Sequence, residues 1–167
     1  MQSEKGLQKC AILKLYINKA NPELVELYKK HIEKHNESIY TTFPYSNSGF
    51  ELFMPDEKIF DIPLHTYLVN MNIKAKMSYF DGIYEEPSAY YILPHSNMAK
   101  TQLMLANHTV VIDSGYREWL NITFRWLNEL GIDIMGDYVI EKHTKLLQIC
   151  HPTLCPIFVE MIEEIDL

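Results

Sequence analysis

The sequence predicts an all-β protein, a jelly roll or β-barrel, with one helix added near its amino end. Three observations support this fold class. Apolar and polar residues alternate with a period of two over residues 67–80 and again over residues 120–126, as in strands that turn one face inward. Gly, Pro, Asn and Asp separate such short stretches at nearly regular spacing. A clear helical period occurs only over residues 22–36.

The first elements are a strand and the helix. Residues 9–17, KCAILKLYI, are rich in β-forming residues and predict a strand. Asn21 is suited to cap a helix and Pro22 to occupy its first turn, so we expect a helix over about residues 22–36. This helix is either a packed decoration or an added docking surface. Its apolar stripe consists of Leu24, Leu27, Tyr28 and Ile32.

The rest of the chain predicts strands. The alternation over residues 67–80 indicates either one long strand or a tight hairpin, and residues 120–126 indicate a further strand. Residues 137–152 and 156–167 supply the last strands. Because no internal repeat, low-complexity tract or linker interrupts the chain, we expect one domain over residues 1–167.

Composition limits the function classes. The chain has 167 residues, of which 47% are apolar and 22% charged, which is typical of a globular protein. Its net charge of −7 argues against nucleic-acid binding, which depends on Lys and Arg. No apolar run approaches the roughly 18 residues of a membrane helix, and the amino end is too polar for a signal peptide. We therefore expect no membrane partner, no nucleic-acid partner and a cytoplasmic location.

Two groups of residues raise the question of a metal. The segment CHPTLC brings Cys150, His151 and Cys155 together, either as zinc ligands or as buried, inert thiols beside a histidine. The segment HIEKH places His31 and His35 four residues apart, on one face of a helix. Its glutamate is in the third position, whereas a zinc-protease motif has it in the second, so we interpret this segment as a solvated helix face.

Four stretches of the chain together resemble a known family. They are NSGFELFMP (47–55), YYILPHSNMAK (90–100), LANHTVVIDSGYREWL (105–120) and KLLQICHPTLCPIFVEMIEEID (145–166). In order and spacing they resemble the dUTPase motifs A-G-x-D-L, P-R-S-x-x-A, N-x-x-G-x-I-D-x-x-Y and R-I-A-Q-L. The third stretch is the most specific. The resemblance, which begins near Ser48, implies a dUTPase-like jelly roll that assembles as a homotrimer and binds dUTP.

The resemblance implies roles for residues of the second and third motifs. Asp113 matches the catalytic carboxylate that orients the attacking water, a role that needs a proton acceptor. Tyr116 matches the aromatic wall that packs on the deoxyribose and excludes a 2′-hydroxyl. Asn107 matches a residue of the uracil hairpin, and Ser96 matches a phosphate-contacting serine. The alternative is ordinary structure, because Asp-Ser-Gly suits a tight turn and Tyr116 can cover the core.

The first and fourth motifs imply further site residues. Lys145 and Gln148 stand at the basic and amide positions of the fourth motif and would contact substrate. Glu51 stands at the aspartate of the first motif, which helps to hold hydrated Mg²⁺ through water, so the resemblance implies Mg²⁺ as the cofactor if the protein is active. The alternative for Lys145 and Gln148 is that they belong to a strand without other function.

The chain also departs from the family pattern. His95 replaces the arginine after the proline, and imidazole lacks the forked contacts that guanidinium makes to phosphate. Glu51 is one methylene longer than aspartate, Val110 replaces a glycine, and Glu118 adds negative charge near the expected pocket. The family also has a Gly-rich carboxyl-terminal arm that closes over the triphosphate. The printed sequence ends at EEIDL without such an arm, so we expect weaker phosphate binding and poorer exclusion of water.

Two functions follow from these observations. The first is a dUTPase-like homotrimer with weakened or lost catalysis, acting as a binding or structural subunit, possibly of a viral particle. The balance of Ile, Asn, Lys and Tyr suits an AT-rich genome, which many large DNA viruses have, so we expect either a cytoplasmic or a virion location. The second is an active, Mg²⁺-dependent dUTP diphosphatase that produces dUMP and pyrophosphate. The expected partners are further copies of the chain and other subunits of a larger assembly.

Overall fold

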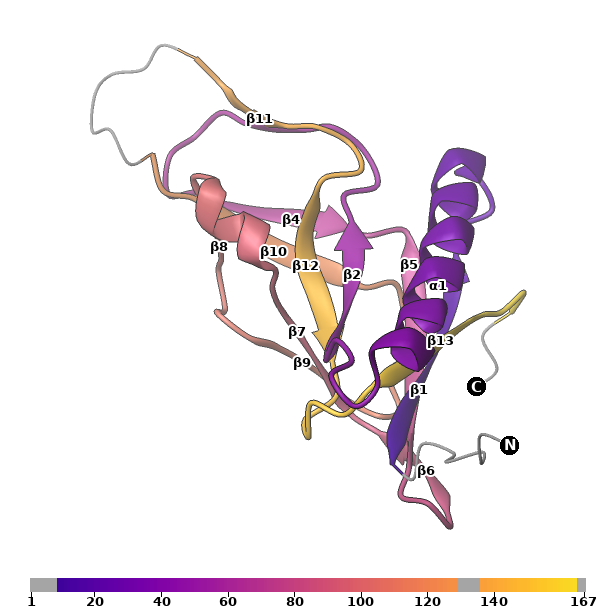
Figure 1. Ribbon diagram of the computed structural model, residues 1–167. Helices are drawn as coiled ribbons and strands as arrows, with labels where there is room; N and C mark the ends of the chain where they lie inside the picture. The colour runs from indigo at the N-terminus through magenta and orange to yellow at the C-terminus, as the bar shows by residue number, and fades with distance from the viewer. Residues whose placement is uncertain (1–8, 129–135, 165–167) are drawn as a thin grey trace.

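A computed structural model describes residues 9–128 and 136–164 of the chain (Figure 1). Most of its regular structure is β-strand, as the sequence predicted, with one α-helix near the amino end and one short 3-10 helix. The carboxyl end, where we expected no arm, lies outside the described residues. The elements in chain order are β1 (Cys10–Ile17), α1 (Pro22–Thr42), β2 (Gly49–Phe53), β3 (Lys58–Phe60), β4 (Thr66–Asn70), β5 (Ile73–Phe80), β6 (Glu85–Ser88), β7 (Tyr90–Pro94), η1 (Ser96–Lys100), β8 (Leu103–Leu105), β9 (Val110–Ile112), β10 (Asn121–Trp126), β11 (Tyr138–Ile140), β12 (Lys145–Cys150) and β13 (Ile157–Met161).

Within these ranges the strands form four sheets. Two sheets have four strands each, in the orders β13-β1-β5-β6 and β2-β12-β7-β9. A third sheet has the order β4-β10-β8, and β3 pairs with β11. In the first sheet β1 runs antiparallel to β5 and parallel to β13. The inward side chains of β1 are completely buried, as the alternation of its residues requires.

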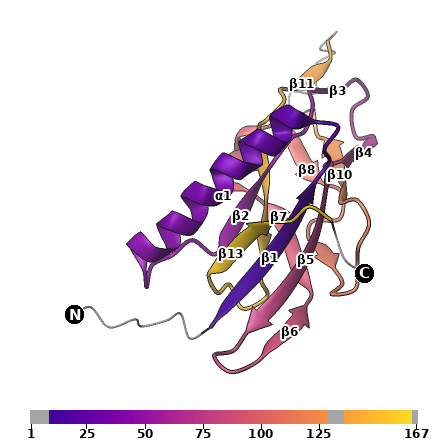
Figure 2. The same ribbon diagram turned by 90° about the vertical axis from the view of Figure 1, so that its right-hand side faces the viewer.

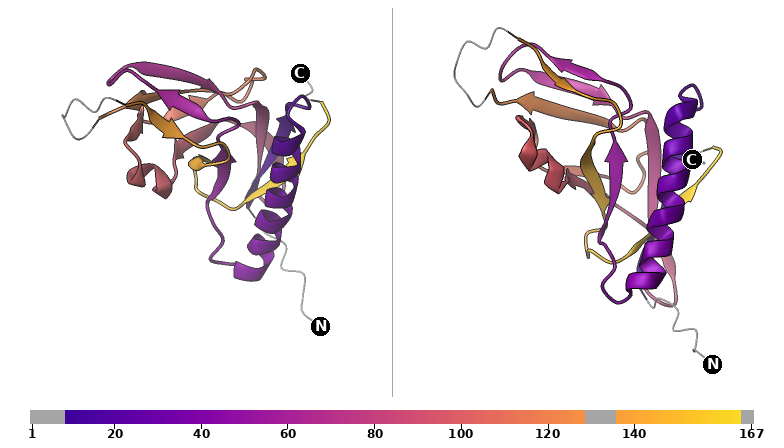
Figure 3. Two further views of the ribbon diagram at one scale, coloured as in Figure 1. Left: turned by 90° about the horizontal axis from the view of Figure 1, so that it is seen from above. Right: turned by 45° about the horizontal axis from the view of Figure 1, so that its top comes forward.

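The helix α1 begins where the sequence predicted and ends later. The Asn21 side chain accepts a hydrogen bond from the Leu24 backbone N–H at 3.1 Å, which confirms the predicted cap. The helix continues to Thr42, beyond the predicted end near residue 36, because His35 and the fully buried Ile39 extend its buried stripe. It lies alongside β13 and β1 (Figures 2 and 3).

The alternating run over residues 67–80 is divided between two sheets. β4 pairs with β10, whereas β5 pairs with β1 and β6. Between the two strands Asn72 has a left-handed backbone (φ 57°), and its N–H donates to the Asn70 side chain at 2.8 Å. Asparagine tolerates this conformation better than most residues. The run is therefore neither one long strand nor a tight hairpin, and both predicted alternatives were wrong.

A single hydrophobic cluster joins the helix to the sheets. Its fully buried aromatic side chains include Tyr28 from α1, Phe50 from β2 and Phe124 from β10. Burying one large apolar side chain stabilises a fold by about 1.5–3 kcal/mol, so α1 contributes to the core together with the strands. Among the described residues, none forms a helix long and apolar enough to cross a membrane.

Candidate functional site

Each of the four motif stretches contributes one strand to the sheet β2-β12-β7-β9. Glu51 on β2 lies opposite Gln148 on β12, and Gln148 lies opposite Leu93 on β7. Figure 1 shows β2 and β12 side by side. The register of β12 shifts between Lys145 and Leu147. Such a bulge changes the alternation of faces, and it allows Lys145 and Gln148, three residues apart, to lie on the same face as Glu51.

The Glu51 carboxylate is the centre of a group of charged and polar side chains. Lys145 Nζ donates to Glu51 Oε2 at 2.6 Å, and Lys145 also lies over the Phe53 ring, 5.4 Å from its centroid. His95 Nε2 lies 3.2 Å from Glu51 Oε1, and His31 Nε2 lies 3.4 Å from Glu51 Oε2. We call Glu51, Lys145, His95 and His31 the Glu51 cluster.

The cluster is held in place by backbone and aromatic contacts. His95 Nδ1 accepts a hydrogen bond from the Asn97 backbone N–H at 3.3 Å, so the proton of a neutral His95 lies on Nε2, the atom that faces Glu51. The His31 ring packs between Phe50 and Phe53, with centroids 4.8 and 5.0 Å away. These contacts orient both imidazoles toward one carboxylate.

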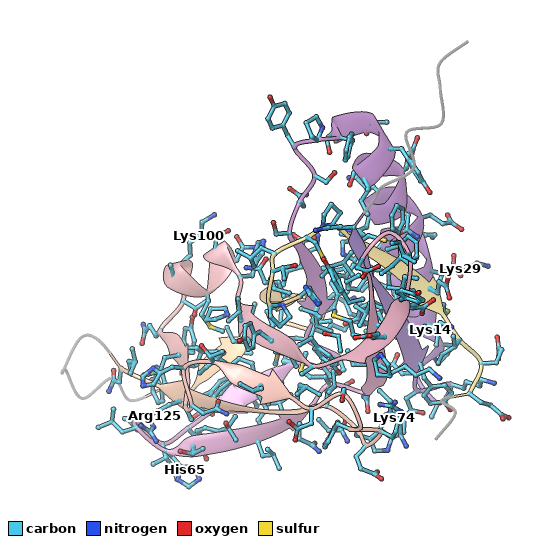
Figure 4. The ribbon with its side chains drawn as sticks, turned by 90° about the horizontal axis from the view of Figure 1, so that it is seen from below. Lys14, Lys29, His65, Lys74, Lys100 and Arg125 are labelled. Atoms are coloured by element: carbon cyan, nitrogen blue, oxygen red, sulfur yellow. The ribbon has the colours of Figure 1, made fainter. Side chains whose placement is uncertain are left out.

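The electrostatics of the cluster favour a charged Glu51 and a neutral His31. Burial by itself raises the pKa of Glu51, but the Lys145 ammonium beside it outweighs burial and holds this pKa below its usual value. Burial, followed by the charge of Lys145, lowers the pKa of His31 to about 4. His31 is therefore neutral at pH 7, and its buried Nε2 has no hydrogen-bond partner among the described residues. Other basic side chains, such as Lys14, Lys100 and Arg125, lie at separate places on the molecule (Figure 4).

This burial predicts a pH-dependent stability. Between pH 6.5, the ordinary pKa of histidine, and about 4, His31 binds a proton in the unfolded chain but not in the folded one, so stability falls as the pH falls. After allowance for solvent screening, we expect His31→Gln to reduce the loss of unfolding free energy between pH 7 and pH 4.5 by on the order of 1–2 kcal/mol. Urea titrations of both proteins at the two pH values measure this loss. An equal loss in both proteins contradicts the prediction.

A cavity of ≈360 Å³ opens beside the cluster. The Gln148 side chain, which forms part of its lining, needs a glycine at position 49, because a Cβ on Gly49 would lie 2.3 Å from Gln148 Oε1. The Gln148 Oε1 can therefore lie against β2, while its Nε2 donates to the carbonyl of Pro94 on β7 at 3.2 Å. The lining residues are His35, Asn47, Ser48, Gly49, Glu51, Leu93, His95, Gln148, Cys150 and Leu154.

Of the predicted site residues, Glu51 and Gln148 line this cavity, and Lys145 contacts Glu51. Ser96 follows His95, is exposed at the start of η1, and is not among the lining residues. Lys145 itself is not among the lining residues. The first, second and fourth motif stretches thus contribute side chains to one region, and the roles of these residues in binding a ligand stay predictions.

The three predicted site residues of the third motif lie outside this cavity. Asp113 follows β9, the edge strand next to β7, and is exposed. Tyr116 is half-buried against the core, and its hydroxyl donates to the Trp119 carbonyl at 3.0 Å. Asn107 is exposed in the loop before β9. None of these three residues lines the cavity beside Glu51. Their roles in substrate binding and catalysis stay predictions.

The interpretation of HIEKH as a solvated helix face was wrong. His35 is buried, and its Nε2 donates to the Ile157 carbonyl at 2.8 Å. His31 belongs to the Glu51 cluster. The signal that could have found both is their spacing, because residues 31 and 35 continue the stripe of Leu24 and Tyr28 at intervals of three and four.

The segment CHPTLC has ordinary hydrogen bonds. His151 Nε2 pairs with the Ser88 hydroxyl at 3.1 Å, and its Nδ1 pairs with the Thr153 hydroxyl at 2.8 Å. Cys150 is buried and Cys155 half-buried. In the described part of the chain, no three His, Cys, Asp or Glu side chains are grouped so that they could hold a metal ion.

Comparison with known proteins gives matches among solved structures. No known protein-family profile and no curated protein matches the sequence. A mutant dUTPase of Staphylococcus bacteriophage 80alpha is 16% identical, covers 75% of this chain and 87% of its own, and has a TM-score of 0.49. The native dUTPase of EIAV is 17% identical, covers 62% and 73%, and has a TM-score of 0.45.

A third matching structure is a mutant dUTPase from phage phi11 of S. aureus, which coordinates a structural Mg(II) ion. It is 18% identical, covers 75% of this chain and 88% of its own, and has a TM-score of 0.48. The solved structures similar to this chain thus include several dUTPases, the family whose motifs its sequence resembles.

Proposed function

We propose that the chain is a dUTPase-like protein with weakened or lost catalysis, and that it acts as a binding or structural subunit of a homotrimer. The contact of 2.6 Å between Lys145 and Glu51 carries this proposal. Lys145 matches the basic position of the fourth motif, where a cation is needed to bind phosphate. Here the chain's own carboxylate already neutralises that cation, so a polyphosphate would have to displace Glu51 before it gained the contact.

The second cationic position of the cavity is weak for a related reason. His95 stands where the family motif has arginine, and its Nε2 lies 3.2 Å from the same Glu51 carboxylate. An imidazole offers one donor where guanidinium offers a charged fork. Since a hydrogen bond to a charged group contributes about 1.5–3 kcal/mol, the loss of two such contacts removes about 3–6 kcal/mol of the energy that would hold a triphosphate.

The position of the third motif supports the homotrimer. Asp113 and Val111 are exposed at the edge strand β9, outside the cavity of their own chain. A neighbouring copy facing this edge would receive Asp113 at its own cavity. Membership of a larger assembly, such as a viral particle, is the further part of the proposal. It is supported by the predicted weakness of the phosphate site. It is also supported by the balance of Ile, Asn, Lys and Tyr, which suits the AT-rich genome of many large DNA viruses.

One observation favours the alternative, an active dUTP diphosphatase. Glu51, His95 and Gln148 come from three different motifs and nevertheless line one cavity. In this reaction water would attack the α-phosphorus, the bond to the bridging oxygen would break, and dUMP and pyrophosphate would leave. Asp113 of a neighbouring copy would accept the proton of the water.

The residues at the cavity do not hold Mg²⁺ by themselves. Mg²⁺ prefers several oxygen ligands in octahedral geometry. Among the described residues that line the cavity, Glu51 is the sole carboxylate, and Lys145 already contacts it. The donor set of this chain therefore does not fit a resident magnesium ion, and any magnesium would have to bring ligands from substrate phosphates.

Pyrophosphate release from dUTP separates the two functions. We expect the purified protein, with dUTP and Mg²⁺, to release pyrophosphate no faster than its Asp113→Asn variant. The Asp113 side chain is exposed, so this variant is expected to fold normally. An established dUTPase serves as the positive control. Turnover well above that of the variant would show an active enzyme, whereas copurification in stoichiometric amounts with a large shell would support the structural role.

A further inference from the structure

The strand β13 is an edge strand whose free side is covered by α1. It pairs with β1 in parallel, through residues 157–161, at the end of the sheet β13-β1-β5-β6. Its inward residues Ile157 and Val159 are buried. Figure 2 shows α1 lying alongside β13. An uncovered apolar edge strand presents a row of unpaired N–H and C=O groups, which is a template for pairing with another chain.

Two side chains of α1 bond to the backbone of this edge. Asn36 Nδ2 donates to the Val159 carbonyl at 2.8 Å, and the Val159 N–H donates to Asn36 Oδ1 at 3.0 Å. The carboxamide thus forms with Val159 the same pair of hydrogen bonds that one residue of an antiparallel neighbouring strand would form. His35 Nε2 donates to the Ile157 carbonyl at 2.8 Å, and burial lowers the pKa of His35, which keeps it neutral.

The residue type supports a specific role for Asn36. Asparagine is a poor residue for a helix interior, because its side chain competes for backbone hydrogen bonds. Asn36 nevertheless lies well inside α1, which runs from Pro22 to Thr42. Its carboxamide bonds across to Val159, 123 residues away in the sequence, and not to its own helix.

The opposite edge of the same sheet is protected in a different way. The outer strand β6 has the sequence EEPS, in which Pro87 removes one backbone donor and Glu85 and Glu86 add exposed charge. Proline and charge are common protections of an edge strand. β13 has the sequence IFVEM and no proline, so its protection comes from α1.

We propose that α1 is an edge cap, in which Asn36 imitates a neighbouring strand and prevents β13 from pairing with β13 of a second copy. The surface concerned is the outer edge of β13, and the partner that it fits is an identical strand. This inference does not depend on the proposed function, because it needs no ligand and no catalysis.

The test replaces Asn36 with leucine, which has a similar size and no hydrogen-bonding group. We expect hydrogen exchange of the Val159 amide to become at least about tenfold faster, because the loss of one hydrogen bond of about 1.4 kcal/mol corresponds to a factor of ten. We also expect sedimentation to show species larger than the wild-type protein, increasing with concentration. Glu33→Ala, at an exposed position of the same helix, is the matched control and should change neither property.

A second variant guards against misfolding. Asn36→Asp keeps the acceptor for the Val159 N–H but places a carboxylate against the Val159 carbonyl, so it should exchange slowly at Val159 and associate less than the leucine variant. Leucine is a better helix former than asparagine, so the leucine variant is not expected to fail by unfolding α1. A leucine variant with a higher melting temperature, wild-type mass at all concentrations and unchanged Val159 exchange overturns the proposal. If only the mass is unchanged, Asn36 is a helix anchor and the proposed block of strand pairing is wrong.

Discussion

Replacing Tyr28 with alanine is expected to lower the free energy of unfolding by about 3–5 kcal/mol, as for other large aromatic side chains removed from a core. Tyr28 is completely buried. Its ring meets Phe53 edge-on, with centroids 5.1 Å apart, and stacks on Phe50 at 6.3 Å. Removing the ring leaves a cavity between α1 and β2, and it also removes the acceptor of a hydrogen bond from the Phe53 N–H, 3.0 Å from the Tyr28 hydroxyl.

Tyr28→Phe separates these two contributions. It keeps the ring and leaves the buried Phe53 N–H without a partner, which costs about 1–3 kcal/mol. Tyr45→Ala is the matched control, because the Tyr45 side chain is 88% exposed and should contribute little. Guanidinium unfolding measured by tryptophan fluorescence and by circular dichroism gives all three values. A Tyr28→Ala protein that loses less than about 1 kcal/mol would show that α1 is only loosely attached to the strands.

The helix shows what local sequence patterns can predict. Asn21, Pro22 and the stripe that begins at Leu24 define its start, since caps and helical periodicity depend on neighbours in the sequence. The partner of that stripe could not be predicted. The contacts of Tyr28 with Phe50 and Phe53 join segments more than twenty residues apart, and no local pattern specifies them.

The strands illustrate the same limit. The β-forming residues of β1 and the alternation of β10 correctly predicted these two strands, because both signals are properties of one strand. Alternation could not predict that residues 67–80 would be divided between two sheets. That division depends on the left-handed backbone at Asn72 and on the pairing of β4 with β10, a strand about fifty residues later.

The candidate site was predicted in part. The motif resemblance named Glu51, Lys145 and Gln148. The structure places Glu51 and Gln148 in the lining of one cavity and Lys145 in contact with Glu51, while their roles stay predictions. The resemblance did not identify His31, because α1 has no counterpart in the motifs. Nor did it show that Lys145 would be neutralised by Glu51, because this depends on a bulge in β12 and on the register of β12 with β2.

Replacing Glu51 with glutamine is expected to increase the affinity for inorganic pyrophosphate at least tenfold. Glutamine keeps the shape of the side chain but removes the charge that now holds Lys145 at 2.6 Å and faces His95 at 3.2 Å. Freed Lys145 can then form a charge-assisted hydrogen bond with a phosphate oxygen. Such a bond contributes about 1.5–3 kcal/mol, and a factor of ten requires about 1.4 kcal/mol. Calorimetric titration at fixed ionic strength, without Mg²⁺, measures the affinity.

Glu23→Gln is the control for this gain. Glu23 forms a similar ion pair, with Lys142 Nζ at 2.8 Å, but it lies outside the cavity and both side chains are mostly exposed. This variant has the same change in net charge, so an equal gain in both variants would reflect long-range electrostatics and not a released site. If wild-type protein and Glu51→Gln bind pyrophosphate equally well, the carboxylate does not compete with phosphate. Lys145 would then be accessible to a triphosphate after all, and the active-enzyme alternative would become the better account of the cavity.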